Sequence, residues 1–466
     1  MARLIMPEDF GMVAMVTAVT HFADQFRTLG LAQSTIQKKD LTQGQISAMF
    51  WINLGIGALL TLAVAAGAPL IAWFYKEPAL MGIALASSLA FVLNGANVQH
   101  TALLNRQMML GRLATVEIVS VAGSSLAGVL GAWNGMGYWA LVLMNISLPA
   151  IRGLMLWFAT GWRPSVILRG TGIRKMLSFG AGVSGFNVVN YFSRNLDNVL
   201  IGRFAGKQQL GYYAKAYSLL LLPIAQIRTP LINVGIPALS ALQDDPERYR
   251  RYYVKIVGTI GFLSMPLVAW MIVGAPDVIR ILLGERWMPA SELFAILGIV
   301  AFIQAPLTAA RGLPMLTTGQ GRKYFLFGVV NSLLVVGGFA AGLPWGARGV
   351  AWGYVVATYV AIPPTSAWCL NGTPVSPRHA WRATWPSMLL AGLVGAAAWA
   401  IRRGIHGAMG DGLFTATISL AATALALGVI LGLTVWARPE FRHEVVALLR
   451  KKKARTASAG PSEEEP

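Results

Sequence analysis

Thirteen long stretches of mostly apolar residues run through the 466-residue sequence. About twenty such residues suffice for a helix to cross a bilayer. Charged residues make up only 12% of the chain, against about 25% in soluble proteins. The stretches do not alternate polar and apolar residues as barrel strands do, so we predict membrane-spanning helices. The predicted spans lie near 10–32, 46–74, 79–100, 114–134, 138–160, 176–200, 210–240, 253–282, 291–316, 324–342, 349–369, 385–401 and 412–437.

The net charge of +19 comes from 38 basic and 19 acidic residues. If the segment 33–45 is cytoplasmic, alternation of the spans places 23 basic residues on that side and 8 on the other. Cytoplasmic loops of membrane proteins carry this kind of excess. The charge therefore indicates topology rather than a nucleic-acid partner, and it predicts a cytoplasmic C-terminus.

Several chemical functions lack their sequence signatures. The single cysteine, Cys369, leaves no disulfide framework or CxxC site, and the five histidines form no HExxH pair. A GxGxxG pattern at 180–185 lies inside an apolar stretch with no strand before it, so it indicates close helix packing. No phosphate-binding GxxxxGK[ST] loop occurs. We therefore expect no cofactor, no metal and no enzymatic activity.

Short motifs recur about 200 residues apart and predict an internal repeat. They imply two six-helix lobes of equal orientation followed by two further helices. Since the span at 176–200 precedes Arg203, its equivalent would precede Arg3, and we expect one helix to be missing before Met1. The paired motifs are Phe10-Gly11 with Leu210-Gly211, Gln25-Phe26-Arg27-Thr28 with Gln226-Ile227-Arg228-Thr229, Gly67-Ala68-Pro69 with Gly274-Ala275-Pro276, and, loosely, Gly137-Tyr138-Trp139 with Gly349-Val350-Ala351-Trp352. The predicted units are an N-terminal lobe at 1–165, a C-terminal lobe at 166–370, two extra spans at 371–440 and a disordered cytoplasmic tail at 441–466.

The segment from Arg3 to Asn53, which includes Pro7-Glu8-Asp9-Phe10-Gly11 and Phe50-Trp51-Ile52-Asn53, resembles the WzxC-like bacterial polysaccharide transporters. These belong to the multidrug/oligosaccharidyl-lipid/polysaccharide exporter superfamily. The resemblance implies an all-α inner-membrane flippase or exporter with two six-helix lobes. It also implies a lipid-linked glycan substrate, such as a polyprenyl-diphosphate oligosaccharide, contact with membrane lipids, and partnership with polysaccharide polymerases and glycosyltransferases.

Ionisable residues inside the predicted spans are the candidates for substrate contact. Arg27 and Arg228 occupy equivalent positions of the repeat, and guanidinium groups bind phosphate well. Asp24 lies three residues before Arg27, so these two residues either form a structural pair or serve substrate binding and coupling. Asp24 is the only carboxylate that we expect to lie deep in a span.

Three more cations complete the candidate set. Lys215 lies about one turn into its span. Arg311 and Arg152 lie near the predicted cytoplasmic ends of theirs, where they either bind substrate or extend to lipid headgroups. Polar residues of the spans either line a hydrophilic path or form interhelical hydrogen bonds. These are Asn53, Asn94, Asn145, Asn187, Asn190 and Asn233.

The leading hypothesis is a flippase for a lipid-linked anionic glycan that works by alternating access. The alternative is a cation-coupled exporter of small molecules from the same superfamily, which would need buried carboxylates in a lobe. A membrane-embedded glycosyltransferase or polymerase would need catalytic carboxylates or histidines in a large external loop. No loop in this sequence is long enough for that.

Overall fold

The computed structural model describes residues 2–25, 35, 42–165 and 195–437. Within this part the regular structure is helical, with thirteen α-helices and two short 3-10 turns at Glu285–Trp287 and Leu343–Trp345. Residues 195–204 are also helical. The helices are α1 (Pro7–Asp24), α3 (Gln43–Tyr75), α4 (Ala79–Arg106), α5 (Leu110–Trp133), α6 (Tyr138–Thr160), α8 (Gly206–Ser240), α9 (Pro246–Val273), α10 (Ala275–Leu282), α11 (Pro289–Thr317), α12 (Gly321–Gly342), α13 (Gly346–Leu370), α14 (Pro377–Met409) and α15 (Leu413–Ala437).

Twelve of the predicted spans coincide with long helices of the described part, which confirms the all-α membrane architecture. Ten helical ranges there are long and apolar enough to cross a membrane, and one of these, Gly321–Leu370, contains both α12 and α13. The predicted span at 176–200, the GxGxxG pattern at 180–185 and the tail at 441–466 fall wholly or mostly outside the described residues.

One predicted boundary is wrong. The sequence suggested a single span at 253–282, but α9 ends at Val273 and α10 begins at Ala275. Pro276 lies in the first turn of α10, where its missing N–H costs nothing. In a continuous helix the same proline would remove a hydrogen bond and clash with the preceding turn. The proline therefore favours a new helix at this position.

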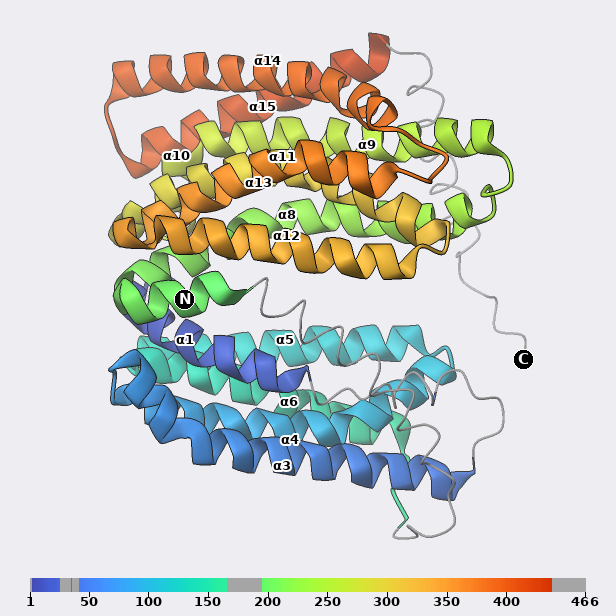
Figure 1. Cartoon of the computed structure of the whole chain (residues 1–466). Coiled ribbons are helices and arrows are strands. Elements are labelled where there is room, and N and C mark those ends of the chain that lie inside the picture. The colour runs from blue at the N-terminus through green and yellow to red at the C-terminus, as the bar shows by residue number, and fades with distance from the viewer. Residues whose placement is uncertain (1, 26–34, 36–41, 166–194, 438–466) are drawn as a thin grey trace, which may run out of the picture.

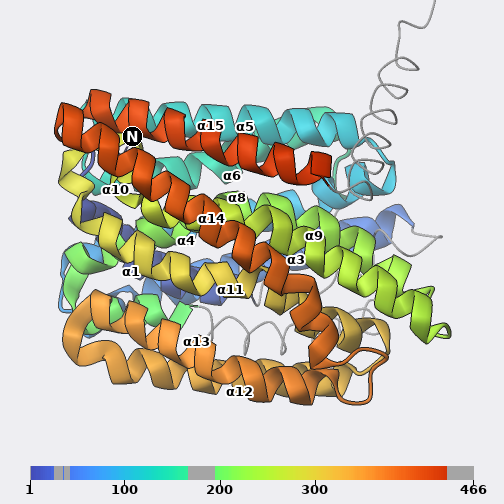
Figure 2. The same cartoon turned by 90° about the horizontal axis from the view of Figure 1, so that it is seen from above.

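The long helices run roughly side by side and begin and end at two opposite ends of the molecule (Figure 1). In the first half, α3 packs on α4, α5 on α6, and α1 on α4. In the second half, α11 packs on α8, α9 and α13, and α12 packs on α13. The C-terminal hairpin of α14 and α15 lies against α9 and α10 (Figures 1 and 2).

The two halves meet where α1 crosses α8, and this contact is symmetric. A Cβ atom on Gly11 would overlap the carbonyl oxygen of Lys207, and one on Gly211 would overlap the carbonyl oxygen of Pro7. Adding 200 to the number of Gly11 gives Gly211, and subtracting 200 from that of Lys207 gives Pro7, so the two contacts are equivalent. A local twofold axis therefore passes between the two glycines, which confirms the predicted repeat and explains why both positions lack a side chain.

The repeat register near α6 and α13 differs from the sequence prediction. Gly137 precedes α6 with φ +55° and ψ −129°, and Gly346 starts α13 with φ +65° and ψ −153°. Asp9 of α1 lies beside Gly137, and Gln209 of α8 accepts a hydrogen bond from the Ala347 N–H at 2.8 Å. Gly137 therefore corresponds to Gly346, an offset of 209, rather than to Gly349.

The apolar cores show how the halves are joined. The largest cluster contains buried residues of both halves, among them Met15 of α1, Leu210 of α8 and Phe294 of α11. These residues lie toward the end where α1 and α8 begin. Toward the opposite end, the described residues form separate clusters, one around Leu104 in the first half and one around Tyr253 in the second. Among the described residues, the halves therefore share a core at one end and have separate cores at the other.

Candidate functional site

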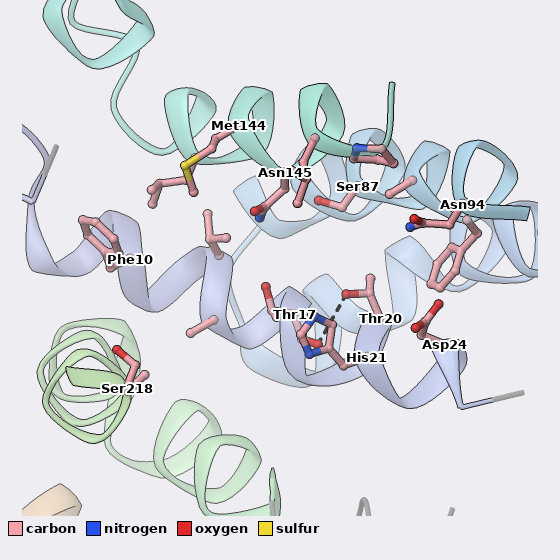
Figure 3. A pocket seen from close by; sticks show the side chains of 18 of the residues that line it. Phe10, Thr17, Thr20, His21, Asp24, Ser87, Asn94, Met144, Asn145 and Ser218 are labelled. Carbon is pink, nitrogen blue, oxygen red and sulfur yellow. Dashed lines mark hydrogen bonds between the residues drawn. The ribbon is translucent and has the colours of Figure 1, made fainter. Parts of the chain in front are cut away.

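A cavity of about 480 Å³ lies between α1, α4, α6 of the first half and α8 of the second half (Figure 3). The cavity lies next to the shared apolar core, on the side that faces the separate cores of the two halves. The lining residues are Phe10, Val13, Ala14, Thr17, Thr20, His21, Asp24, Ser87, Ala90, Phe91, Asn94, Leu141, Met144, Asn145, Leu148, Pro149, Arg152, Gly211, Ala214, Lys215 and Ser218. We call this space the central cavity.

Lys215 brings a positive charge to the central cavity from α8. Its Nζ atom lies 4.9 Å from the centroid of the Phe10 ring on α1. An ammonium group at this distance from an aromatic face is attracted by the ring electrons. The contact joins the two halves, and within the described residues the Lys215 ammonium donates no hydrogen bond, so its three N–H groups can serve a ligand.

Arg152 brings a second positive charge from α6. It forms an ion pair with Glu117 of α5, and both side chains are partly exposed, 29% and 50% respectively. Glu117 does not line the central cavity, but it lines a second space of about 380 Å³ between α4, α5 and α6, in which Arg152 also takes part. Arg152 therefore lies at the boundary between two cavities.

Polar groups of α1 complete the wall opposite Arg152. Thr17, Thr20, His21 and Asp24 follow a spacing of three, one and three residues, which places them on one face of the helix. The Thr20 hydroxyl donates to the Thr17 carbonyl at 3.3 Å. Among the described residues that line the cavity, Asp24 is the one acidic group, and it lies next to the end of the described part of α1.

Two amide side chains face the cavity from α4 and α6. Figure 3 shows Asn145 and Asn94 projecting into the space bounded by α1. Within the part of the chain that the structure describes, neither amide hydrogen-bonds to another residue. Asn94 is partly exposed and Asn145 is exposed, so both amides can donate to and accept from a hydroxyl-rich ligand. Both belong to the polar span residues for which the sequence left a hydrophilic path and interhelical hydrogen bonds as alternatives.

The structure brings three of the predicted site residues together: Lys215, Arg152 and Asp24 all line the central cavity. Arg228 lies on α8 thirteen residues after Lys215, roughly 20 Å further along the helix axis, and is half-buried outside this cavity. Arg27 lies outside the described residues.

Arg311 is buried within the second half, with 4% of the residue exposed. Its Nη1 donates to the Thr365 hydroxyl of α13 at 2.8 Å, and its Cζ lies 5.1 Å from the centroid of the Phe327 ring of α12. The side chain therefore neither extends to lipid headgroups nor lines the central cavity. The prediction of a headgroup contact is wrong because the hydroxyl and the aromatic ring of adjacent helices hold the guanidinium inside.

The sequence analysis missed a buried ionic cluster that joins the second half to the C-terminal hairpin. Asp277 of α10, whose side chain is 1% exposed, pairs with Arg402 at 2.9 Å and His406 at 3.1 Å on α14. It also accepts from the Ser419 hydroxyl of α15 at 2.9 Å. Asp24 is therefore not the only deep carboxylate. The sequence did contain a signal for this cluster, because Asp277 is a lone acidic residue within the apolar stretch 271–283.

The outer edge of this ionic cluster is at the turn between α14 and α15. His406 Nδ1 lies 2.6 Å from a carboxylate oxygen of Asp411. This hydrogen bond holds the pKa of the exposed Asp411 carboxyl below its usual value. A separate buried carboxylate, Asp197, accepts a hydrogen bond from the Tyr213 hydroxyl at 2.9 Å.

The comparisons with known proteins agree with this architecture. The profile of a family described as "Polysaccharide biosynthesis protein" matches residues 1–292. The chain belongs to this family. It is similar to the lipopolysaccharide biosynthesis protein WzxC of Escherichia coli (strain K12), with 25% identity over 76% of this chain and 73% of that protein. It is also similar to the teichuronic acid biosynthesis protein TuaB of Bacillus subtilis (strain 168), with 26% identity over 73% of this chain and 71% of that protein.

Two solved structures share the fold of this family member. The lipid II flippase MurJ in an inward closed conformation matches with a TM-score of 0.69 over 93% of this chain and 94% of that chain, at 13% identity. An inward-facing multidrug resistance MATE family transporter matches with a TM-score of 0.55 over 84% and 89%, at 14% identity. At these identities the likeness concerns the fold alone.

Proposed function

We propose that this family member moves lipid-linked oligosaccharide or polysaccharide precursors across the bacterial inner membrane by alternating access. The relatives named for lipopolysaccharide and teichuronic acid biosynthesis support the substrate class. The fold shared with a lipid II flippase supports the type of movement. The protein would work beside the glycosyltransferases and polymerases that make and use such precursors.

The observation that carries this proposal is the central cavity between the halves. It combines two cations, Lys215 and Arg152, with amide and hydroxyl groups. A polyprenyl-diphosphate glycan presents negatively charged phosphates and many sugar hydroxyls. Cations in a partly desolvated cavity bind such phosphates more strongly than they would in water, and the amides suit the sugar. We propose that Lys215 and Arg152 contact the diphosphate.

The packing of the halves supports alternating access. At one end they share an apolar core, while at the other the described residues form separate cores. Rocking about the close crossing of Gly11 and Gly211 would open one end as it closes the other. If the positive-inside rule sets the orientation, the end with separate cores is cytoplasmic. In that case the cavity admits substrate from the side where it is made.

The proposal also covers the functional units of the chain and the candidate arginines outside the central cavity. We propose functional units at 1–165, 166–370 and 371–440 and a cytoplasmic C-terminal tail at 441–466. Arg27 and Arg228 are proposed to contact substrate on the path between the central cavity and the cytoplasmic end. Arg311 is proposed to act on that path only in a conformation in which α11 and α13 separate.

One observation favours a second function, the cation-coupled export of small molecules. Asp24 and His21 line the central cavity, so a carboxylate and an imidazole face the space through which a substrate would pass. Under this alternative, drug tolerance of cells would depend on the chain and on an ion gradient, and Asp24→Asn would abolish it. Polysaccharide export would then be independent of the chain.

Complementation of a polysaccharide-export mutant tests the leading proposal. Lys215→Gln and Arg152→Gln should each reduce surface polysaccharide at least tenfold while membrane levels of the protein stay normal. The matched control is Arg403→Gln, because Arg403 is an exposed cation whose Cζ lies 5.2 Å from the centroid of the Trp399 ring on α14, outside the cavity. Full export by both cavity variants contradicts the proposed site.

A further inference from the structure

A second basic cavity lies far from the central one, where α9 and α14 begin. Its volume is about 530 Å³, and four of its six lining residues are charged. The lining residues are Glu247, Arg250, Arg251, Val254, His379 and Arg382. Both helices begin at the same end of the molecule and pack against each other (Figures 1 and 2). Three arginines against one glutamate give this space an excess of positive charge.

The hydrogen bonds around this cavity leave it rich in donors. Arg250 Nε donates to the Pro374 carbonyl at 2.6 Å, which fixes the guanidinium at the cavity and leaves its terminal N–H groups for a ligand. Within the described residues, Arg251 and Arg382 form no ion pair. Three guanidinium groups converging on one space repel each other unless an anion lies between them.

His379 adds a further donor. Its Nδ1 accepts from the Ser376 N–H at 3.1 Å as part of the N-terminal cap of α14. A neutral imidazole whose Nδ1 is an acceptor carries its proton on Nε2. The other ring nitrogen is therefore an N–H donor. The cavity also lies beside the N-terminal turns of α9 and α14, where helix dipoles favour negative charge.

The surface next to the cavity suits hydrocarbon chains. Along α14, every fourth residue from Trp381 onward is a large exposed apolar side chain: Trp381, Trp385, Leu389 and Leu393. Residues four apart share one face of a helix, so this apolar stripe starts beside Arg382 and runs along α14 away from the cavity. Tryptophans at its start are typical of the membrane interface.

We propose that this cavity binds the phosphate headgroup of an anionic membrane phospholipid, whose acyl chains lie along the apolar stripe of α14. Basic pockets between helices at the cytoplasmic face are suited to such headgroups. The cluster of donors recognises the phosphate, and the stripe favours a lipid over a free phosphate ion. The bound lipid would hold α14 against α9 and is independent of the transported substrate.

Native mass spectrometry of the full chain in neutral detergent tests this site. Phosphatidylglycerol should bind with a measurable dissociation constant, and phosphatidylcholine should not. Arg251→Gln/Arg382→Gln should weaken phosphatidylglycerol binding by about 25-fold, since each basic side chain near a headgroup contributes about fivefold. Equal binding by this double variant and the wild type overturns the proposal.

A matched control distinguishes lipid binding in this cavity from general attraction to the positive charge at this end of the molecule. Arg248→Gln/Arg378→Gln removes the same charge from the first turns of the same two helices, at exposed positions that do not line the cavity. It should bind phosphatidylglycerol like the wild type, and an equal loss would overturn the proposal. Millimolar inorganic phosphate should displace little of the lipid. Complete displacement would instead assign the cavity to a free anion.

Three further variants keep the test decisive if the double glutamine variant does not fold. Arg251→Lys/Arg382→Lys conserves the charges and should retain binding within a few-fold of the wild type. The single variants Arg251→Gln and Arg382→Gln should each lose about fivefold. Melting temperatures measured without lipid show whether a variant is folded. Wild-type affinity in both single variants contradicts the proposal.

Discussion

Replacing Gly11 by alanine tests whether the two halves depend on the close crossing of α1 and α8. The new Cβ would overlap the Lys207 carbonyl oxygen and lie 3.1 Å from the Gly211 nitrogen. Both neighbours are backbone atoms, which cannot rotate away as a side chain can. The helices must therefore separate, and overpacking of this kind costs about 1–3 kcal/mol.

The matched control is Gly55→Ala on α3, where no atom lies within 4 Å of an added Cβ. Alanine there should stabilise the helix by about 0.5–1 kcal/mol because it restricts the unfolded chain. The two variants should therefore differ by about 1.5–4 kcal/mol in free energy of unfolding. For a chain of this size that corresponds to a difference of about 2–4 °C in melting temperature.

Thermal unfolding of the purified variants in detergent measures this difference. Gly211→Ala should behave like Gly11→Ala, because the local twofold axis exchanges the two positions. The double variant should cost less than the sum, since helices already separated by one methyl group accept the second more easily. Equal melting temperatures for Gly11→Ala and Gly55→Ala would refute the symmetric crossing.

Three further predictions concern charged groups outside the central cavity. Asp277→Asn should lower the free energy of unfolding by about 3 kcal/mol, because it leaves Arg402 partly buried without its carboxylate; an unchanged melting temperature contradicts this. The depressed pKa of Asp411 means that its hydrogen bond to His406 stabilises the fold above about pH 4 and is lost as the pH falls below that range. The melting-temperature difference between the wild type and Asp411→Asn should shrink there, and a pH-independent difference argues against the bond. Arg311→Met should raise the melting temperature, since no described carboxylate pairs with this buried cation; a lower melting temperature would show that Arg311 stabilises the fold.

The sequence was informative about the positions of the helices. Each span is about twenty apolar residues bounded by charges or glycines, and that pattern depends only on the thickness of the bilayer. The break between α9 and α10 was missed because Pro276 sits in an apolar stretch that looks continuous. The repeat was visible because Gly11 and Gly211 occupy a contact that tolerates no side chain.

The site was only partly predictable, because a helix that is apolar all round does not indicate which face lies toward its neighbours. Lys215 and Arg152 could be named as intramembrane cations, but their common cavity depends on the rotation of α8 and α6. The same limit explains Arg311, whose hydroxyl and aromatic partners come from α13 and α12. The partners of Asp277 lie more than 120 residues away in the sequence.

Reconstituted flipping is the most direct test of the proposed function. The purified chain would be placed in liposomes that carry a fluorescent polyprenyl-diphosphate oligosaccharide in one leaflet, and transfer would be followed by reduction of the exposed fluorophore. We expect transfer by the wild type and by Arg403→Gln, and at least a tenfold slower rate for Lys215→Gln/Arg152→Gln. A wild-type rate in the double cavity variant would contradict the claim that the substrate passes through the central cavity.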